Sequence, residues 1–174
     1  AFAVKHAAGR CKIIAGTGSN DTAHSVHLTR EAEKCGVDGI LLVAPYYNKP
    51  NQEGLFRHFE AIAAVTSLPV IVYNVPSRTV VSLSVETTLR LAQIPNIVGT
   101  KECAPLDQVA MIVAQAPEHF KVYSGDDASA LPAMAVGAYG VISVASHVAG
   151  RSIKEMVAQF FNGNVERASQ LHRE

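Results

Sequence analysis

The sequence predicts an α/β fold in which short parallel strands alternate with amphipathic helices. Apolar or β-branched runs recur along the chain, their first residues lie 19 to 30 positions apart, and an amphipathic segment follows each run. This spacing is the size of one strand–helix unit, and strands joined through a helix are parallel. No linker or low-complexity segment interrupts the series, so residues 1–174 are expected to belong to a single domain.

The expected elements follow one another in regular order. Residues 1–10 resemble the end of a helix. Strands are expected at Lys12–Gly16, Gly39–Ala44, Pro69–Tyr73, Asn96–Lys101, Lys121–Gly125 and Gly140–Val144. Helices are expected at 21–36, 51–65, 84–91, 106–116, 128–136, 152–162 and 165–171. Asp21 or Thr22 caps the first of these, Asn51 and Ser84 open the next two, and Gly36 suits a helix C-terminus.

Two architectures fit such units, an open doubly wound sheet and a closed barrel. A nucleotide-binding open sheet carries the pattern G-x-G-x-x-G, and the segment 16–21 lacks its third glycine. Residues suited to chemistry follow several strands, which favours the barrel. A complete barrel has eight strands and about 250 residues. We therefore predict an incomplete (β/α)8 TIM barrel with about six of eight units, barrel strands 3 to 8, without the first two strands at the N-terminus and the final helices at the C-terminus.

Composition excludes several classes of function. Fifteen basic and fifteen acidic residues cancel, so the chain has no electrostatic footprint for nucleic acid or an anionic membrane. Cys11, Cys35 and Cys103 are odd in number and form no C-x-x-C pair, which argues against a disulfide framework or a zinc site. The opening residues lack the layout of a signal peptide, and no apolar run is long enough to span a membrane. A cytoplasmic protein is expected.

Two strand ends carry residues suited to carbonyl chemistry. Lys101 ends an apolar strand, where desolvation would favour the free amine that a Schiff-base nucleophile requires. Tyr73 ends another strand, and a proline-containing turn then presents Arg78, whose planar guanidinium matches a carboxylate. The alternatives are a surface lysine beside Glu102 and a solvated arginine in an ordinary strand-to-helix turn.

Three other segments have weaker signals. Tyr46 and Tyr47 follow the second strand, and their hydroxyls could relay protons or their rings could pack a loop or a subunit interface. Asp126 and Asp127 follow the fifth strand, where helix capping is favoured over metal binding because no further ligand stands nearby. His24 and His27 share a helix face without a third ligand and are interpreted as surface residues.

The chain resembles the dihydrodipicolinate synthase family, within the pyruvate-dependent class I aldolase and N-acetylneuraminate lyase superfamily. The resemblance covers essentially the whole chain, and its most specific part is Tyr-Asn-Val-Pro-Ser-Arg-Thr. The motifs occur in the family's order at 16–18, 45–48, 73–79, 101–102, 124–127 and 140–143. The resemblance implies condensation of pyruvate with L-aspartate 4-semialdehyde to 4-hydroxy-tetrahydrodipicolinate, in lysine and diaminopimelate biosynthesis. It also implies a homotetramer built from dimers, without a metal or other cofactor.

By this resemblance Lys101 forms the imine with pyruvate, and Tyr73 donates and accepts protons. Tyr47 reaches across a dimer interface to complete the proton relay, and Arg78 receives the semialdehyde carboxylate. The backbone of two further residues lines the pyruvate pocket: Gly125 and Ile142.

The sequence departs from the family in two places. The relay also uses a threonine from a Gly-Thr-Thr-Gly-Glu run, which does not occur in residues 1–174, so the relay of these residues alone is expected to be incomplete. The allosteric lysine site corresponds to Asn20, His24 and Tyr46, and His24 stands where lysine-inhibited members have glutamate, so weak or absent feedback inhibition is expected. Two rival functions are a sugar-acid lyase of the same superfamily, which has no need of Arg78, and a non-catalytic barrel.

Overall fold

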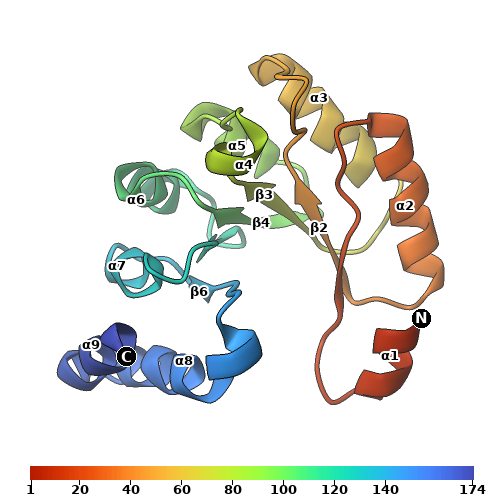
Figure 1. The fold of residues 1–174 in the computed structure, drawn as a ribbon. Helices are drawn as coiled ribbons and strands as arrows, with labels where there is room; N and C mark the ends of the chain where they lie inside the picture. The colour runs from red at the N-terminus through yellow and green to blue at the C-terminus, as the bar shows by residue number, and fades with distance from the viewer.

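The computed structural model describes residues 1–174, in which six parallel strands form one curved sheet. Each strand pairs with the strand that follows it in sequence, so β1 and β6 are the edges. Figure 1 shows the sheet curling with its helices outside, as in part of a barrel. The strands are β1 (Ile14–Gly16), β2 (Gly39–Val43), β3 (Val70–Asn74), β4 (Ile97–Glu102), β5 (Lys121–Ser124) and β6 (Gly140–Val141).

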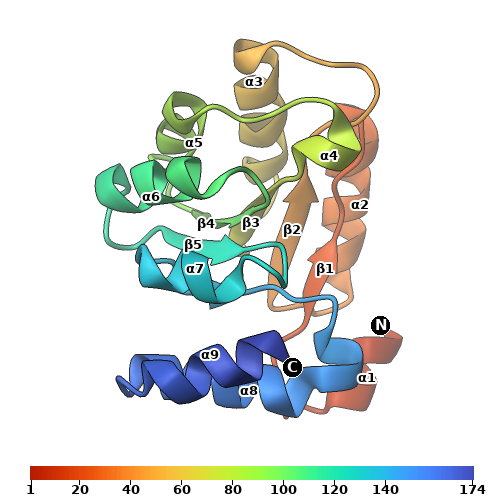
Figure 2. The same cartoon turned by 60° about the vertical axis from the view of Figure 1, so that its left-hand side comes forward.

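The helices cover the outer face of this sheet and its two ends. Figure 2 shows α8 and α9 side by side below α7, whereas α2 and α3 stand beside β1 and β2. The helices are α1 (Phe2–Ala7), α2 (Thr22–Lys34), α3 (Gln52–Ala63), α4 (Pro76–Thr79), α5 (Val85–Leu91), α6 (Leu106–Gln115), α7 (Ala130–Ala135), α8 (Ser146–Phe161) and α9 (Val165–Arg173). The alternation of strands and helices predicted from the sequence is confirmed.

Side-chain caps start three of the helices where the sequence predicts them. The carboxylate of Asp21 accepts a hydrogen bond from the His24 amide at 2.6 Å. The Asn51 side chain accepts from the Gly54 amide at 2.8 Å, and the Ser84 hydroxyl accepts from the Thr87 amide at 3.1 Å. These bonds satisfy amides that have no partner within the helix, so the capping residue in the sequence determines where each of these helices begins.

The segment after β6 differs from the expectation. The strand is only two residues long, and α8 begins at Ser146 instead of residue 152, with a non-helical Ala149 inside it. The reason is Asp127, whose Oδ2 accepts hydrogen bonds from the amides of Val144 and Ala145 at 3.1 and 2.9 Å. These two amides are therefore engaged by a side chain instead of a neighbouring strand.

The main hydrophobic core lies between the sheet and the helices α3, α5 and α6. Twenty buried residues form it, and Ile40, Phe59, Ile62, Val70 and Ile112 are among its fully buried members. β3 and β4 are the best covered strands, as expected for the two central strands of a parallel sheet with helices packed on its outer face. This core holds rigid the strand ends from which the functional side chains project.

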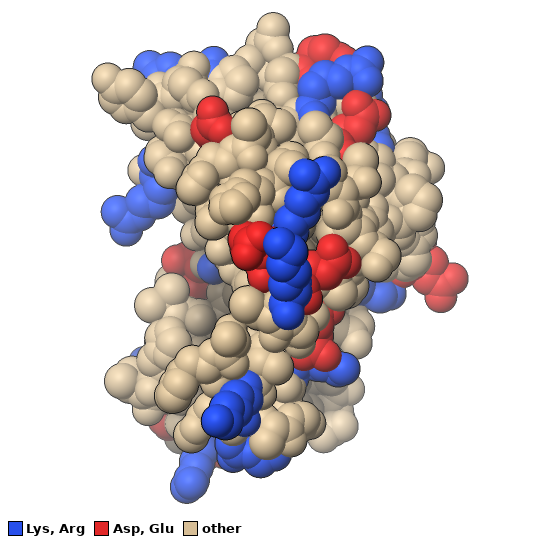
Figure 3. All heavy atoms as spheres, turned by 90° about the vertical axis from the view of Figure 1, so that its right-hand side faces the viewer, with Lys and Arg blue, Asp and Glu red and all other residues tan.

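The surface has mixed charge. Figure 3 shows basic and acidic side chains interspersed on one face, without a continuous region of either sign. No helix in the structure is long and apolar enough to cross a lipid bilayer.

Candidate active site

A row of residues in register across the sheet sets the geometry of the site. Val43 pairs with Tyr73, Tyr73 with Lys101, and Lys101 with Tyr123. Neighbouring parallel strands lie about 4.8 Å apart, so the side chains of such a row touch. Tyr73 and Lys101, separated by an entire strand–helix unit in sequence, are therefore adjacent because of sheet register.

Lys101 is a buried lysine with no carboxylate partner among the ion pairs of the structure. Its exposed fraction is 7%, and its Nζ lies over the ring of Tyr73, 4.2 Å from the centroid. Lysine is almost never buried without a partner, and a cation over an aromatic face is a weak substitute for one. The prediction that Lys101 faces the interior at a strand end is borne out in position, and the surface-lysine alternative is not.

Gly125 follows β5 and lets the backbone approach Lys101 closely. A Cβ atom at this position would lie 2.9 Å from Lys101 Cγ and 3.1 Å from Lys101 Cε, and it would also collide with Cys103 Sγ. The backbone of Gly125 is held there by its amide, which donates to the carbonyl of Glu102 at 2.8 Å. A glycine is therefore required by the space that the lysine side chain occupies.

A cavity of about 380 Å³ opens beside this lysine. Lys101 lies behind its wall, against Tyr73 and Gly125, so attack on a molecule in the cavity requires the amine to rotate off the tyrosine face. The cavity is lined by Tyr73, Val75, Ser77, Arg78, Cys103, Gly125, Asp126, Asp127 and Val144. The cavity is thus lined by the phenol of Tyr73, by the guanidinium of Arg78 and by residues that follow β4, β5 and β6.

Arg78 projects into this cavity from α4, a short helix where the sequence indicated only a turn. Pro76 occupies the first helical turn, where the missing N–H costs nothing. The Thr79 hydroxyl bonds the carbonyls of Val75 at 3.1 Å and Val81 at 2.8 Å, which closes the segment on itself. Arg78 is exposed and forms no ion pair in the structure, so its guanidinium is available to an anion.

Burial and neighbouring groups alter the acidity of Tyr73. Burial raises the pKa of its hydroxyl, the adjacent Cys103 thiol raises it further, and the Arg78 charge acts in the opposite direction. The tyrosine hydroxyl is therefore protonated at neutral pH and able to donate. Burial raises the pKa of the Cys103 thiol, although the Lys101 charge and the Tyr73 side chain lower it. The sequence analysis did not place Cys103 in the site.

Tyr47 lies away from the cavity. It is 87% exposed on the loop after β2, and its φ of 76° is in the left-handed region that side chains rarely adopt. Strain of this kind persists where the surroundings impose it and clusters at functional sites. The residues 1–174 by themselves do not bring Tyr47 to Lys101.

The three residues assigned to an allosteric site come from the loop after β1, the first turn of α2 and the loop after β2. Asn48 donates a hydrogen bond from Nδ2 to the carbonyl of Asn20 at 2.9 Å, which joins the loop after β2 to the loop after β1. His24 is exposed in the first turn of α2, and Tyr46 is 42% exposed. The loop that carries Tyr46 is thus joined to the loop that carries Asn20, and the role of these residues in lysine binding stays a prediction.

Ile142 and the two aspartates complete the rim. The Ile142 amide bonds the carbonyl of Ser124 at 2.9 Å, which places its backbone beside the end of β5, although Val144 instead lines the cavity. Asp126 accepts from the amide and hydroxyl of Ser129, the residue that precedes α7, so it braces the turn before this helix instead of capping the helix as the sequence suggested. Burial opposes ionisation of Asp127, but hydrogen bonds from Ser143, Ala145 and Val144 together with the Lys101 charge leave its pKa lowered.

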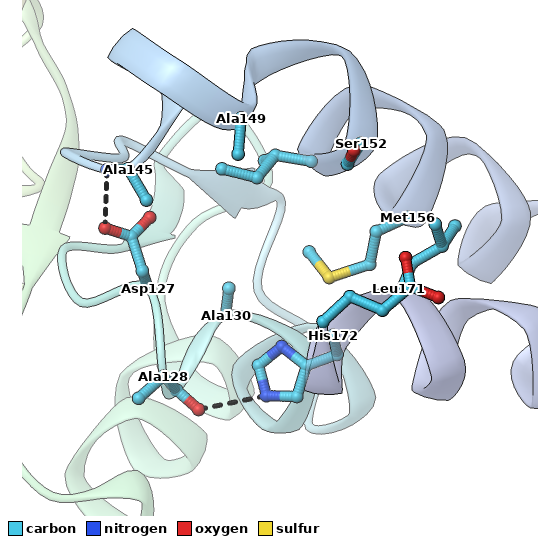
Figure 4. A pocket seen from close by; sticks show the side chains of 11 residues that line it. Asp127, Ala128, Ala130, Ala145, Ala149, Ser152, Met156, Leu171 and His172 are labelled. Atoms are coloured by element: carbon cyan, nitrogen blue, oxygen red, sulfur yellow. Dashed lines mark hydrogen bonds between the residues drawn. The ribbon is translucent and has the colours of Figure 1, made fainter.

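A second hollow of about 340 Å³ lies between α7, α8 and α9. Figure 4 shows Met156, Leu171 and Ser152 beside it, and Asp127 and His172 at its edge with their side chains in hydrogen bonds. Asp127 bonds the Ala145 amide, and His172 Nε2 bonds the carbonyl of Ala128 at 3.1 Å. No lysine, arginine or tyrosine lines this hollow, so the side chains suited to carbonyl chemistry lie in and beside the cavity next to Lys101.

Comparison with known proteins agrees with this geometry. The sequence model of the dihydrodipicolinate synthetase family matches residues 1–174. The chain belongs to this family. It is 58% identical over 173 residues to the 4-hydroxy-tetrahydrodipicolinate synthase of Moorella thermoacetica, an alignment that covers 98% of this chain and 59% of the relative. The chain thus spans somewhat more than half the length of the relatives it matches.

Solved structures of family members share the fold. Dihydrodipicolinate synthase from Aquifex aeolicus superposes with a TM-score of 0.96 and 50% identity, covering 99% of this chain and 59% of the other. The chloride-inhibited enzyme from Acinetobacter baumannii, solved in complex with pyruvate, superposes with a TM-score of 0.93 at 43% identity. The match covers 98% of this chain and 59% of the other. The expectation of six strands of a (β/α)8 barrel is confirmed by these matches together with the observed sheet.

Proposed function

We propose that this chain carries the imine-forming site of a 4-hydroxy-tetrahydrodipicolinate synthase, which condenses pyruvate with L-aspartate 4-semialdehyde. The observation that carries the proposal is the buried, unpaired Lys101 with its amine on the face of Tyr73, beside a cavity that also holds Arg78. The name of the Moorella relative and the pyruvate complex of the Acinetobacter relative support the same chemistry.

In the first stage the Lys101 amine attacks the keto carbon of pyruvate. A proton delivered to the former keto oxygen lets water leave, and a protonated imine remains. Tyr73 is placed for this transfer, because its ring is in contact with the Lys101 amine and its hydroxyl holds its proton at neutral pH. The protonated imine then withdraws electrons from the methyl group, which loses a proton to give an enamine. The imine itself is the electron sink, so these steps need no cofactor.

In the second stage the enamine carbon attacks the aldehyde of the second substrate, and the aldehyde oxygen becomes a hydroxyl group. The amine of that substrate then attacks the imine carbon, which closes the ring and releases Lys101. Arg78 is suited to bind the second substrate's carboxylate, because a guanidinium can form two parallel hydrogen bonds with it. Arg78 and Gly125 line the same cavity of about 380 Å³, which supports binding of both substrates there.

We further infer that Tyr47 completes the site from a neighbouring subunit, in a homotetramer built from dimers. Its exposure and its strained backbone support a role that requires a partner surface. Gly125 and Ile142 would present backbone groups to pyruvate. Asn20, His24 and Tyr46 would form a surface site for lysine, the end product of the biosynthetic pathway in which we place this cytoplasmic enzyme. Residues 1–174 would form part of one barrel domain.

Borohydride trapping tests the proposal directly. The chain is incubated with pyruvate and sodium borohydride, and peptide mass mapping locates the reduced adduct. The same measurement is made on a hybrid barrel, in which residues 1–174 replace the matching segment of the Moorella relative. An adduct on Lys101 that disappears in Lys101→Ala is expected. The absence of any adduct in both proteins overturns the proposal.

A substrate panel then separates the synthase from a sugar-acid lyase. The hybrid barrel with an adduct is assayed for condensation of the semialdehyde and for cleavage of N-acetylneuraminate. Condensation without cleavage is expected because Arg78 faces the cavity. Cleavage without condensation would reassign the chain to the lyase activity.

A further inference from the structure

A buried polar pair lies directly beneath the row that forms the site. Asn74 and Glu102 are the next residues after Tyr73 and Lys101, and they pair with each other in register. Successive side chains of a strand point to opposite faces, so this pair faces the helices while Tyr73 and Lys101 face the interior. Asn74 is 0% and Glu102 2% exposed. Polar side chains so deeply buried need a reason, since their desolvation is costly.

The Asn74 side chain closes the segment that carries Arg78. Its Oδ1 accepts a hydrogen bond from the Leu83 amide at 3.1 Å, and its Nδ2 lies 3.4 Å from the Ser82 hydroxyl. The main chain runs from Asn74 through α4 to these same two residues. The segment 74–83 is therefore a loop whose far end is bound to its first residue.

Glu102 orients Asn74. Its Oε1 accepts from Asn74 Nδ2 at 2.8 Å and from the Ala104 amide at 3.0 Å. With Nδ2 directed to Glu102, the amide of Asn74 has only one orientation, in which Oδ1 faces Leu83. An acceptor at the end of β4 thus orients the side chain that joins the two ends of the loop after β3, while Gln52 and Gln108 hold the carbonyls of Ser82 and Leu83 from outside it. The other oxygen of Glu102, Oε2, has no hydrogen-bond partner.

We propose that Glu102 is a positioning residue of this site, which acts through Asn74 to hold the Arg78 loop in the geometry that binds the carboxylate of the second substrate. The inference rests on the proposed synthase function and adds a residue that touches neither substrate. Glu102 acts as the neutral acid, because a carboxylate whose second oxygen lacks a donor is unfavourable in a buried position.

The surroundings of Glu102 favour that neutral form. Asn74 is the polar group that faces it from β3, and α6 contributes apolar side chains. Asp126, a second acid, lines the same small hollow from the loop after β5, together with Cys103. Lys101 precedes Glu102 but projects from the opposite face of β4. Burial is the main reason that the pKa of Glu102 is raised to about 7, although hydrogen bonds from Ala104 and Asn74 lower it.

The test uses the hybrid barrel and two readouts, the rate of pyruvate trapping at Lys101 and the KM for the semialdehyde. Glu102→Ala leaves Asn74 without its acceptor, and the KM is expected to rise about tenfold or more with trapping nearly unchanged. Glu102→Gln keeps an acceptor at the position of Oε1 and is expected to preserve both readouts. The matched control is Glu86→Gln, which alters an exposed carboxylate of α5.

The pH dependence provides a test that does not require the alanine variant to fold. Ionisation makes Oε2 a buried anionic oxygen without a donor, which favours movement of the carboxylate toward water and away from Asn74. The unmodified barrel should therefore lose semialdehyde affinity as pH rises through about 7, whereas Glu102→Gln should not. Three results would overturn the inference. Glu102→Ala could change trapping and KM equally, or Glu102→Gln could impair either readout. The unmodified barrel and Glu102→Gln could also have the same pH profile. Loss of trapping in the unsubstituted barrel would instead refute the proposed function itself.

Discussion

Substituting Gly125 with alanine tests whether the Lys101 side chain needs the space that a glycine leaves at this position. Gly125 does not have a positive φ, so the consequence comes from space alone. The added Cβ would collide with Cys103 Sγ, and it would lie 2.9 Å from Lys101 Cγ and 3.1 Å from Cε, both shorter than a van der Waals contact between carbon atoms. Cys103 and Lys101 must therefore shift, or the loop after β5 must retreat.

The magnitude follows from the tightness of the site. Adding a methyl group to a packed position costs about 1–3 kcal/mol, and for a chain of this size about 2 kcal/mol lowers Tm by roughly 4–8 °C. Displacement of a reacting group by ~1 Å can reduce a rate by ~100-fold. Gly125→Ala should therefore slow pyruvate trapping by more than its loss of stability explains, measured well below its own Tm.

The matched control is Gly140→Ala in β6. A Cβ at that position would meet Tyr123 Cδ1 at 4.0 Å, which is an ordinary contact. This variant should melt and trap pyruvate like the unsubstituted protein, in thermal unfolding and in borohydride kinetics. If Gly125→Ala forms the Lys101 adduct at the unchanged rate, the close approach has no consequence for the nucleophile and the reasoning is wrong.

Three further predictions concern separate features. Arg78→Ala should leave imine formation intact and reduce condensation by orders of magnitude, since loss of a charged clamp costs about 2–5 kcal/mol; equal damage to both steps, followed by trapping and product assays, would make Arg78 a structural residue. His58 is buried, which lowers its pKa from 6.5 to about 4, so between these pH values the unfolded chain binds a proton at this histidine and the folded chain does not. Stability should therefore fall by roughly 3 kcal/mol between pH 6.5 and 4, and urea titrations of His58→Gln should show a flatter profile. Lysine should inhibit the hybrid barrel weakly, because His24 offers no carboxylate to its ammonium group; strong inhibition in a lysine titration would contradict this assignment.

The sequence by itself determined the local features of the molecule. The spacing of apolar runs predicted all six strands, and Asp21, Asn51 and Ser84 marked three helix starts, because both signals depend on residues within one or two turns of each other. Lys101 was recognisable because a lysine at the end of an apolar strand is uncommon, whereas Arg78 alone could equally have been a solvated arginine in an ordinary turn. The family resemblance then gave these residues expected roles.

Only the tertiary structure decided how those residues are arranged. Sheet register brings Tyr73 against Lys101, and a backbone approach that no local pattern encodes makes Gly125 necessary. Asp127 sets the end of β6 by bonding amides that follow it by 17 and 18 positions. Glu102 holds a loop that precedes it by about 20 residues. The physical reason is common to all four: these contacts join residues far apart in sequence, and their geometry exists only after the sheet has assembled.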